Sequence, residues 1–166
     1  MGKLVVIAVA VILSIGRLES EGVAPMKESD WIPQFIKGCC QVYGIDERVA
    51  VGVIRTESSG RVNVESKTGA IGLMQVLPST ARWFCSDSTL TVRDLADPFE
   101  NIRIGIRYLA SLKSEHKGNM RLALLSYNRG PGTVQRALKH HRNPDNGYYS
   151  RVMKLSGEVQ TLEIRT

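Results

Sequence analysis

The sequence predicts a mainly α-helical single domain with at most a short β element. The chain has 166 residues, which suits one domain with its own hydrophobic core. Beyond residue 30, the dominant local signals are helix caps, apolar residues at helical spacing and helix-ending glycines. There is no low-complexity tract and no repeat at the period of a solenoid. These observations favour one helical fold with short loops.

The first residues carry the pattern of an export signal. Lys3 precedes an uncharged apolar stretch, residues 4–15, which is shorter than the roughly 20 residues of a membrane-spanning helix. We therefore assign residues 1–24 to a signal peptide or N-terminal anchor and residues 25–166 to the folded domain. An anchor that is not cleaved would associate the protein with the inner membrane through residues 4–15. In either case the protein is expected in the periplasm or cell envelope.

Two helices are expected in the first third of the folded domain. The first covers residues 31–43 and ends at Gly44. Asp46 can cap the second, because its carboxylate accepts hydrogen bonds from the free N–H groups of a first helical turn. The buried face of this second helix is predicted from apolar residues at helical spacing: Ile45, Val49, Ala50, Val53 and Ile54. Glu57 continues this spacing, so it lies on or beside the buried face, and Gly60 fits the position after the helix.

The middle of the chain is predicted to hold an irregular segment between helices. Residues 61–77 are expected to form loops with a short strand or two, and residues 78–84 fit a short helix. The clearest helix start is at 97–100, where an aspartate, a proline and a glutamate have the spacing of a capping box. The helix behind it should run to about His116.

The last third is also predicted to be helical. Asn119 caps a leucine-rich helix that ends near Asn128, and glycine and proline break the chain at 130–132. Two more helices are expected near 133–141 and 147–163.

The chain is basic, with a formal charge of +6 at pH 7 and a pI of about 9.4. Such a surface favours polyanions, namely nucleic acid, anionic lipid or acidic cell-wall polymer, or is simply a solvated surface with excess positive charge. The basic residues are scattered and do not alternate with aromatic residues. This distribution argues against a nucleic-acid partner.

The cysteines do not have the spacing of a metal site. Cys39 and Cys40 are adjacent, and adjacent cysteines rarely bond to each other because the bridge strains the backbone. In an exported protein we therefore expect one of them to bond Cys85, with one thiol left over; three buried thiols are the alternative. The sequence has no zinc motif, phosphate loop or Ser-His-Asp order, so no metal or cofactor is expected.

Glu57 is the first candidate for chemistry. A carboxyl group on an apolar helix face loses hydration, which raises its pKa and lets it donate a proton near neutral pH. The structural alternative is a half-exposed glutamate at a helix end, where it opposes the helix dipole. Hydrolytic glycosidases normally pair two carboxylates at about 5 to 10 Å, but no second acid lies in the motifs that follow Glu57.

Short motifs follow Glu57 in a specific order. They are residues 57–60 (ESSG), 69–75 (GAIGLMQ), 101–102 (NI), 126–128 (SYN) and 130–132 (GPG). This ordered set resembles the catalytic domain of the soluble lytic transglycosylases, a bacterial and phage family with a lysozyme-like, mainly α fold. The resemblance covers roughly residues 30–155, so residues 25–166 are read as a lysozyme-like catalytic domain with a glycan-binding groove.

The resemblance implies roles for several residues. Glu57 matches the single acid/base glutamate of the family. Ser66 falls where the family places a serine that contacts the N-acetyl group of the substrate. Met74 and Gln75 match the turn that lines the glycan groove.

The C-terminal motifs carry further implied substrate contacts. Tyr127 and Asn128 match a Tyr-Asn pair whose tyrosine sits close to the glutamate, and Tyr148 resembles the tyrosine that opens the last motif. The acidic residue that the family usually places before that motif has no clean match. Asp145 is nearest, in a segment, residues 143–147, that looks shortened.

The activity implied is that of a peptidoglycan lytic transglycosylase. It would cleave the MurNAc-(β1,4)-GlcNAc bond and leave 1,6-anhydromuramic ends, with glycan strands rather than nucleic acid as partner. Glu57 would give a proton to the bond and take one from the muramyl C6 hydroxyl, and the N-acetyl group of the sugar would replace a second carboxylate. The alternatives are a hydrolytic muramidase of the same fold and a catalytically idle wall-binding protein, for example at a secretion or conjugation machine.

Overall fold

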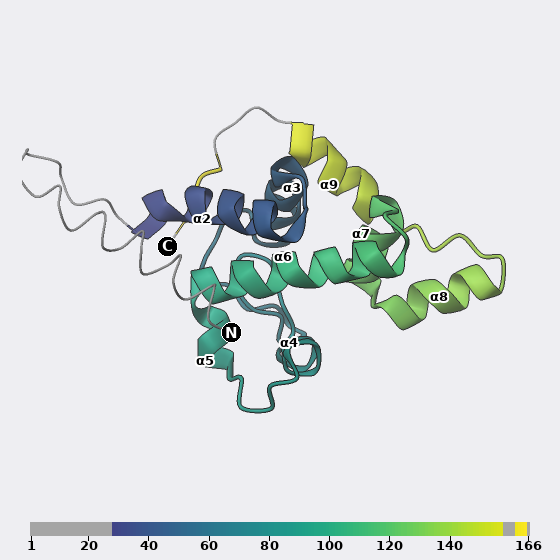
Figure 1. Cartoon of the computed structure of the whole chain (residues 1–166), viewed down its shortest axis with the longest axis horizontal. Helices are drawn as coiled ribbons and strands as arrows, with labels where there is room; N and C mark the ends of the chain where they lie inside the picture. Colours follow the sequence, from purple (N-terminus) through teal and green to yellow (C-terminus); the bar gives the residue numbers. More distant parts are fainter. Residues whose placement is uncertain (1–27, 158–161, 166) are drawn as a thin grey trace, which may run out of the picture.

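Eight helices account for most of the part of the chain that the structure describes (Figure 1). A computed structural model describes residues 28–157 and 162–165, so the signal or anchor segment predicted over 1–24 lies outside the described residues. The helices are α2 (Glu28–Tyr43), α3 (Glu47–Ser58), α4 (Pro78–Cys85), α5 (Val92–Ala96), α6 (Pro98–Glu115), α7 (Met120–Arg129), α8 (Pro131–Lys139) and α9 (Tyr148–Gly157). The prediction of a mainly α-helical fold is confirmed, and none of these helices is long and apolar enough to cross a membrane.

Helix α6 lies at the centre of the fold and contacts α2, α4, α5 and α7 (Figure 1). Its start is set as predicted by Asp97, whose Oδ1 accepts a 2.8 Å hydrogen bond from the backbone N–H of Glu100. The helix is fully buried along much of its length, at Ile102, Ile104, Ile106, Leu109 and Leu112. Each such side chain stabilises the fold by roughly 1.5–3 kcal/mol relative to an exposed position.

Two helix starts differ from the predictions. The Glu100 carboxylate does not complete a capping box; it pairs with Arg103, one turn further along α6, at 2.5 Å. The guanidinium at i+3 is a charged, two-pronged donor, which a carboxylate prefers to a single backbone N–H. A capping box does form between Thr91 and Asp94, and it begins the short helix α5, for which no prediction was made.

The irregular segment 61–77 is fastened to α6 by Asn101, whose side chain is completely buried. Its Nδ2 donates hydrogen bonds to the carbonyls of Ile71 (2.8 Å) and Leu95 (2.9 Å). Its Oδ1 accepts a 2.8 Å hydrogen bond from the backbone N–H of Met74. Because water cannot replace these bonds in the interior, they fix the turn around Met74 to the central helix.

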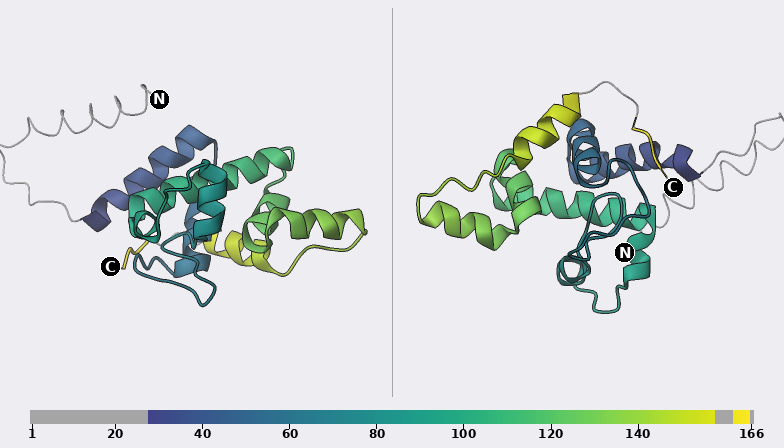
Figure 2. Two further views of the ribbon diagram at one scale, coloured as in Figure 1. Left: turned by 90° about the horizontal axis from the view of Figure 1, so that it is seen from below. Right: turned by 180° about the vertical axis from the view of Figure 1, so that it is seen from behind.

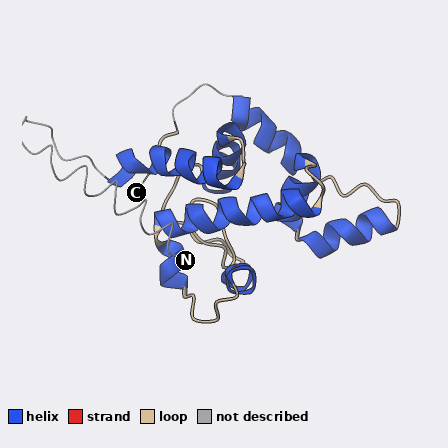
Figure 3. Cartoon of the chain, in the orientation of Figure 1, coloured by secondary structure: helices blue, strands red, loops and turns tan. Residues whose placement is uncertain are grey.

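Within segment 61–77 the expected short strands are reduced to isolated β-bridges, Glu65 with Ile71 and Ile71 with Val76. No strand is drawn anywhere in the described part of the chain (Figure 3). This agrees with the prediction of at most a short β element.

The C-terminal helix predicted over 147–163 is too long. Helix α9 ends at Gly157, and residues 162–165 instead run beside the segment that follows α3. Gly60 permits this approach: its φ is +76°, and a Cβ at this position would collide with the carbonyl oxygen of Glu163. The pairing depends on two distant segments meeting, so helical spacing could not reveal it.

Helices α3 and α9 pack closely against each other. The contact is possible because Gly52 has no side chain: a Cβ there would meet the backbone oxygen of Val152 at 2.6 Å and the hydroxyl of Ser156. Arg55 adds a 2.7 Å hydrogen bond from its Nη1 to the carbonyl of Leu155. The end of α3 is therefore held at a set position relative to α9.

The disulfide predicted between Cys39 or Cys40 and Cys85 is not formed, and all three thiols are free. Cys39 and Cys40 are buried on α2. Burial raises the pKa of the Cys39 thiol to about 11 and that of the Cys40 thiol to about 12. Because the thiolate is the reactive form, these two residues behave as small apolar core residues.

Helix α8 and the loop that follows it form one end of the molecule, opposite α2 (Figure 2). The break predicted at 130–132 is observed, with Gly130 at a φ of +80° and Pro131 as the first residue of α8. The loop at 140–147 then returns the chain from the end of α8 to the start of α9.

Candidate active site

Glu57 and Tyr148 meet where the end of α3 lies against the start of α9. Glu57 is the penultimate residue of α3 and is half-buried. Tyr148 is the first residue of α9 and is almost fully buried, with 1% of its surface exposed. Its hydroxyl donates a 2.5 Å hydrogen bond to Oε1 of Glu57. A short bond of this kind is typical of a hydroxyl that donates to a carboxylate.

Burial raises the pKa of the Glu57 carboxyl above its ordinary value. Loss of hydration is the largest cause, since it disfavours the charged form. The hydrogen bond from Tyr148 and the positive charge of Arg151 act in the opposite direction, but they only reduce the rise. The result is a carboxyl group that holds its proton to a higher pH and still has a donor ready to stabilise its anion.

Tyr127 lies close enough for the Glu57 charge to act on it, but its hydroxyl bonds elsewhere. It donates a 2.9 Å hydrogen bond to the carbonyl of Met74. Burial, followed by the negative charge of Glu57, holds the pKa of Tyr127 well above its ordinary value. The direct partner of the glutamate is therefore Tyr148, whereas Tyr127 holds the turn that contains Met74.

In the turn at Met74 and Gln75, the first side chain is buried in the core and the second is partly exposed. The Met74 side chain is fully buried and lies against Gly105 of α6. This side chain has no exposed surface, and the glycan contact that the motif implies for the turn at Met74 stays a prediction. Gln75 is half-buried and has a φ of +48°, and its Nε2 donates to the carbonyls of Val64 (3.2 Å) and Gly72 (3.0 Å). A non-glycine residue in this conformation is strained and persists only where its surroundings fix it.

Ser66 forms hydrogen bonds within the loop that precedes this turn in the sequence. Its Oγ accepts a 3.0 Å hydrogen bond from the backbone N–H of Ala70 and lies 2.9 Å from the hydroxyl of Thr68. These contacts give Ser66 a structural task in the loop. The contact with a substrate N-acetyl group stays a prediction.

Asn128 lies at the exposed end of α7 and contacts the segment before Tyr148. Its Oδ1 accepts a 2.8 Å hydrogen bond from Nδ2 of Asn146. Oδ1 of Asn146 in turn accepts a 3.2 Å hydrogen bond from the backbone N–H of Tyr148. The three residues thus form a chain of hydrogen bonds from α7 to the first residue of α9.

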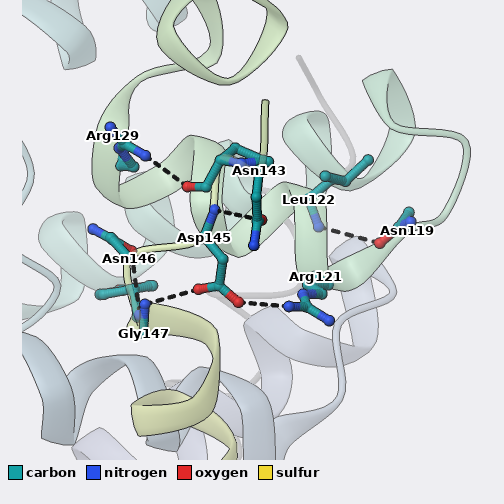
Figure 4. Close-up of polar contacts among 10 residues, drawn as sticks. Asn119, Arg121, Leu122, Arg129, Asn143, Asp145, Asn146 and Gly147 are labelled. Carbon is teal, nitrogen blue, oxygen red and sulfur yellow. Dashed lines mark hydrogen bonds and ion pairs between the residues drawn. The ribbon is translucent and has the colours of Figure 1, made fainter. Parts of the chain in front are cut away.

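The segment 143–147, which looked shortened in the sequence, is tied to α7 by two arginines (Figure 4). Nη2 of Arg121 donates to Oδ2 of Asp145 at 2.6 Å, and Nη1 of Arg129 donates to the carbonyl of Pro144 at 2.6 Å. The other oxygen of Asp145 accepts a 2.8 Å hydrogen bond from the N–H of Gly147. Sequence spacing identified Asp145 but could not identify Arg121 as its partner.

Three other acids in the segment 87–100 already accept hydrogen bonds from neighbouring side chains. Asp87 accepts hydrogen bonds from Thr89, Asp94 from Thr91, and Glu100 from Arg103. Among the described residues, the groups that change the pKa of Glu57 by a hydrogen bond or a charge are Tyr148 and Arg151, and neither is an acid. Arg151 was not predicted, although its position one turn after Tyr148 on α9 places it on the same side of the helix.

No cluster of His, Cys, Asp and Glu suited to hold a metal ion was found among residues 28–157 and 162–165. The candidate site combines one half-buried acid, a hydroxyl that donates to it, a nearby guanidinium and a strained turn fixed by a second tyrosine.

Comparison with known proteins finds relatives that are named as transglycosylases. The sequence matches the model of the transglycosylase SLT domain over residues 26–149. It is 34% identical over 127 residues to the membrane-bound lytic murein transglycosylase C of Actinobacillus succinogenes, covering 69% of this chain and 35% of the relative. It is 35% identical over 112 residues to a transglycosylase of Enterobacteria phage PRD1, covering 68% of this chain and 38% of the relative. The chain thus spans little more than a third of the length of these relatives.

Solved structures agree with the sequence matches. The fold superposes on an inactive mutant of the lytic transglycosylase Slt of Pseudomonas aeruginosa with a TM-score of 0.65 and 27% identity, over 74% of this chain and 23% of that one. It superposes on the 70-kDa soluble lytic transglycosylase of Escherichia coli with a TM-score of 0.63 and 27% identity, over 80% of this chain and 24% of that one. The lysozyme-like fold class implied by the sequence motifs is confirmed by these neighbours. Because the matched region includes most of the chain, the protein belongs to the transglycosylase SLT domain family.

Proposed function

We propose that the protein is a lytic transglycosylase that cleaves the MurNAc-(β1,4)-GlcNAc bond of peptidoglycan and leaves 1,6-anhydromuramic ends. The observation that carries the proposal is the half-buried Glu57, with a raised pKa and a single hydroxyl donor, Tyr148, on its carboxylate. The relatives named as lytic murein transglycosylases support the reaction class. The SLT domain match supports glycan strands as the substrate.

In the first step the protonated Glu57 donates its proton to the glycosidic oxygen. The bond from C1 of MurNAc to that oxygen breaks, and its electron pair leaves with the oxygen as the 4-hydroxyl of GlcNAc. The N-acetyl oxygen of MurNAc can attack its own C1 as this bond breaks, so no second carboxylate is needed. A raised pKa suits this step because the acid must carry its proton near neutral pH.

In the second step the Glu57 carboxylate takes the proton of the MurNAc C6 hydroxyl. That oxygen bonds C1 and displaces the N-acetyl oxygen, which closes the 1,6-anhydro ring without consuming water. Tyr148 stabilises the carboxylate between the two steps, since its hydroxyl donates to Oε1. Holding the sugar so that its own hydroxyl attacks is worth about 7–11 kcal/mol in favourable intramolecular reactions.

We assign the substrate groove to the surface beside Glu57, at Ser66, Gln75 and Asn128. All three carry polar side chains that are at least partly exposed. Tyr127 and Met74 act from behind this surface, because their contact fixes the turn that presents Gln75. We also infer that the protein acts in the cell envelope, which is supported by the apolar N-terminal stretch and by relatives named as membrane-bound.

A hydrolytic muramidase is the second candidate, and water would then replace the C6 hydroxyl in the second step. Mass spectrometry of products from purified peptidoglycan separates the two reactions. Anhydro ends, lighter by one water, are expected; reducing ends would make the protein a hydrolase. Glu57→Gln should lower either activity by about 10³-fold without lowering the melting temperature, since a general acid/base contributes about 10²–10⁴-fold. A fully active Glu57→Gln protein would end the assignment.

A further inference from the structure

Glu57 accepts its hydrogen bond from Tyr148, and Tyr148 directly follows the loop segment 143–147. Tyr148 is the first residue of α9, so no preceding helical turn fixes its backbone. Its position is set by the segment 143–147 that leads into it. We propose that Asp145 and Arg121 are positioning residues that hold Tyr148 against Glu57; this rests on the proposed role of Glu57 as the acid/base.

Asp145 connects the loop to α7 and to the residue before Tyr148. Its Oδ2 accepts from Nη2 of Arg121 at 2.6 Å, and its Oδ1 accepts from the backbone N–H of Gly147 at 2.8 Å (Figure 4). Gly147 has a φ of +79°, so the chain makes a left-handed turn at this point. The Asp145 carboxylate therefore links α7 to Gly147, the residue directly before Tyr148.

The Asp145 carboxylate differs from an ordinary surface acid. Its side chain is 15% exposed, whereas the Arg121 side chain is 54% exposed. The hydrogen bond from Gly147, followed by that from Arg121, holds the pKa of Asp145 below its ordinary value. The group is therefore charged throughout the pH range in which Glu57 titrates, and the contact stays intact there.

Arg121 reaches the start of α9 by a second route. Its guanidinium lies 5.4 Å from the centre of the Tyr149 ring, in the geometry of a cation–π contact. Arg121 thus contacts both the loop and the residue after Tyr148. On the other side, Arg151 lies 5.8 Å from the centre of the Tyr148 ring.

Asp145 and Arg121 do not act on Glu57 directly. The groups on neighbouring elements that bear on Glu57 electrostatically are Tyr148 and Arg151 of α9 and Tyr127 of α7. Neither residue of the Asp145–Arg121 pair is among them. An effect of this pair on the acid therefore passes through the start of α9, which carries Tyr148 and Arg151.

The test compares Asp145→Asn, Tyr148→Phe and the double variant in full-length protein. Two readouts are needed: the pH dependence of kcat on peptidoglycan, and the pKa of Glu57 from its ¹³C carboxyl resonance, assigned by its loss in Glu57→Gln. The Tyr148 hydroxyl stabilises the charged form of Glu57, so loosening it raises the pKa of the acid. Asp145→Asn should therefore move the alkaline limb of kcat to higher pH, as Tyr148→Phe does, and lower kcat about tenfold, as expected for a small misplacement of a catalytic group.

The double variant provides the decisive comparison. If Asp145 acts through Tyr148, adding Asp145→Asn to Tyr148→Phe should cause almost no further change in kcat or in the pKa of Glu57. Arg121→Lys should retain more activity than Arg121→Gln, because it keeps the charge that faces Asp145. Glu163→Gln removes an exposed ion pair with Arg165 and is the matched control; it should change neither readout.

Other results would overturn the proposal. Additive losses in the double variant, or a lower melting temperature with an unchanged pKa of Glu57, would show that Asp145 only stabilises the fold. Should Asp145→Asn fail to fold, the mostly exposed Arg121→Gln carries the same test. The NMR titration needs no turnover, so a protein without transglycosylase activity would refute the proposed reaction and still report on this positioning contact.

Discussion

The hydroxyl of Tyr148 donates a 2.5 Å hydrogen bond to Oε1 of Glu57, and this contact joins residues 91 positions apart in the sequence. It exists because Gly52 lets α3 lie directly against α9. Burial and the hydrogen bond act in opposite directions on the pKa of Glu57, and burial has the larger effect. The acid thus keeps its proton to a higher pH while a donor for its anion is already in place, and both of the proposed proton transfers require this.

Tyr148→Phe should separate the effect of burial on the pKa of Glu57 from the effect of the hydrogen bond. Removing the hydroxyl takes away a group that stabilises the Glu57 carboxylate, so the pKa of Glu57 rises further. The alkaline limb of kcat, which marks loss of the Glu57 proton, should move to higher pH, and kcat on its plateau should fall by about 10- to 100-fold as one preorganised donor is lost. A pH–rate profile on purified peptidoglycan measures both changes. An alkaline limb that moves to lower pH would contradict the stated role of the hydroxyl.

Glu57→Gln should make the protein more stable at neutral pH. The folded state binds the Glu57 proton more tightly than the unfolded state does, because the pKa is raised on folding. The wild type therefore loses stability as the pH rises from the ordinary glutamate pKa through the raised folded value. The glutamine does not titrate and can still accept the hydrogen bond from Tyr148.

The free energy of unfolding in urea, measured for both proteins over a pH series, checks this prediction. The difference in favour of Glu57→Gln should be absent below the ordinary glutamate pKa, grow as the pH rises through the raised value and then stay constant. A difference that is the same at every pH would mean that Glu57 titrates as it does in the unfolded chain.

The helix starts could be predicted because they depend on neighbouring residues. Asp46, Asp97 and Asn119 each accept a hydrogen bond from a backbone N–H two or three residues further on, as their positions indicate. The end of the last helix could not be predicted in this way. Residues 162–165 leave the helical pattern because they pair with a segment near Gly60, and no local signal announces that pairing.

The candidate site shows the same limit. The motif order pointed to Glu57, Tyr127 and Tyr148 and placed the tyrosine of the Tyr-Asn motif close to the glutamate, but it could not show which tyrosine bonds it. The structure gives the direct hydrogen bond to Tyr148, because this pairing is set by how α3 meets α9. The motif also could not show that the Met74 side chain is buried against Gly105, a contact that depends on the turn being fastened to α6.

Asn101→Ala should destabilise the protein strongly. The buried amide makes hydrogen bonds to Ile71, Leu95 and Met74, and an alanine removes all three. The carbonyl of Ile71 keeps its bond from the N–H of Val76, but the N–H of Met74 loses the amide oxygen that accepts from it. A buried unsatisfied group costs about 1–3 kcal/mol, so a loss of about 3 kcal/mol or more in the free energy of unfolding is expected. Asn63→Ala, at an exposed asparagine, is the control and should change the free energy little. A loss below about 1 kcal/mol would mean that water replaces the amide.

Tyr127→Phe should lower turnover much more than stability. The hydroxyl makes one hydrogen bond, to the carbonyl of Met74, and the loss of one such bond costs about 0.5–1.5 kcal/mol. The same bond fixes the turn in which Gln75 holds its strained φ of +48°. A looser turn misplaces the surface that is proposed to bind the glycan, so kcat/KM should fall at least about tenfold.

Tyr108→Phe is the matched control for Tyr127→Phe: the Tyr108 ring lies 5.6 Å from that of Tyr127, and the Tyr108 hydroxyl makes no hydrogen bond to another described residue. Equal losses of kcat/KM in both variants would trace the effect to the aromatic packing and not to the hydroxyl that holds the turn.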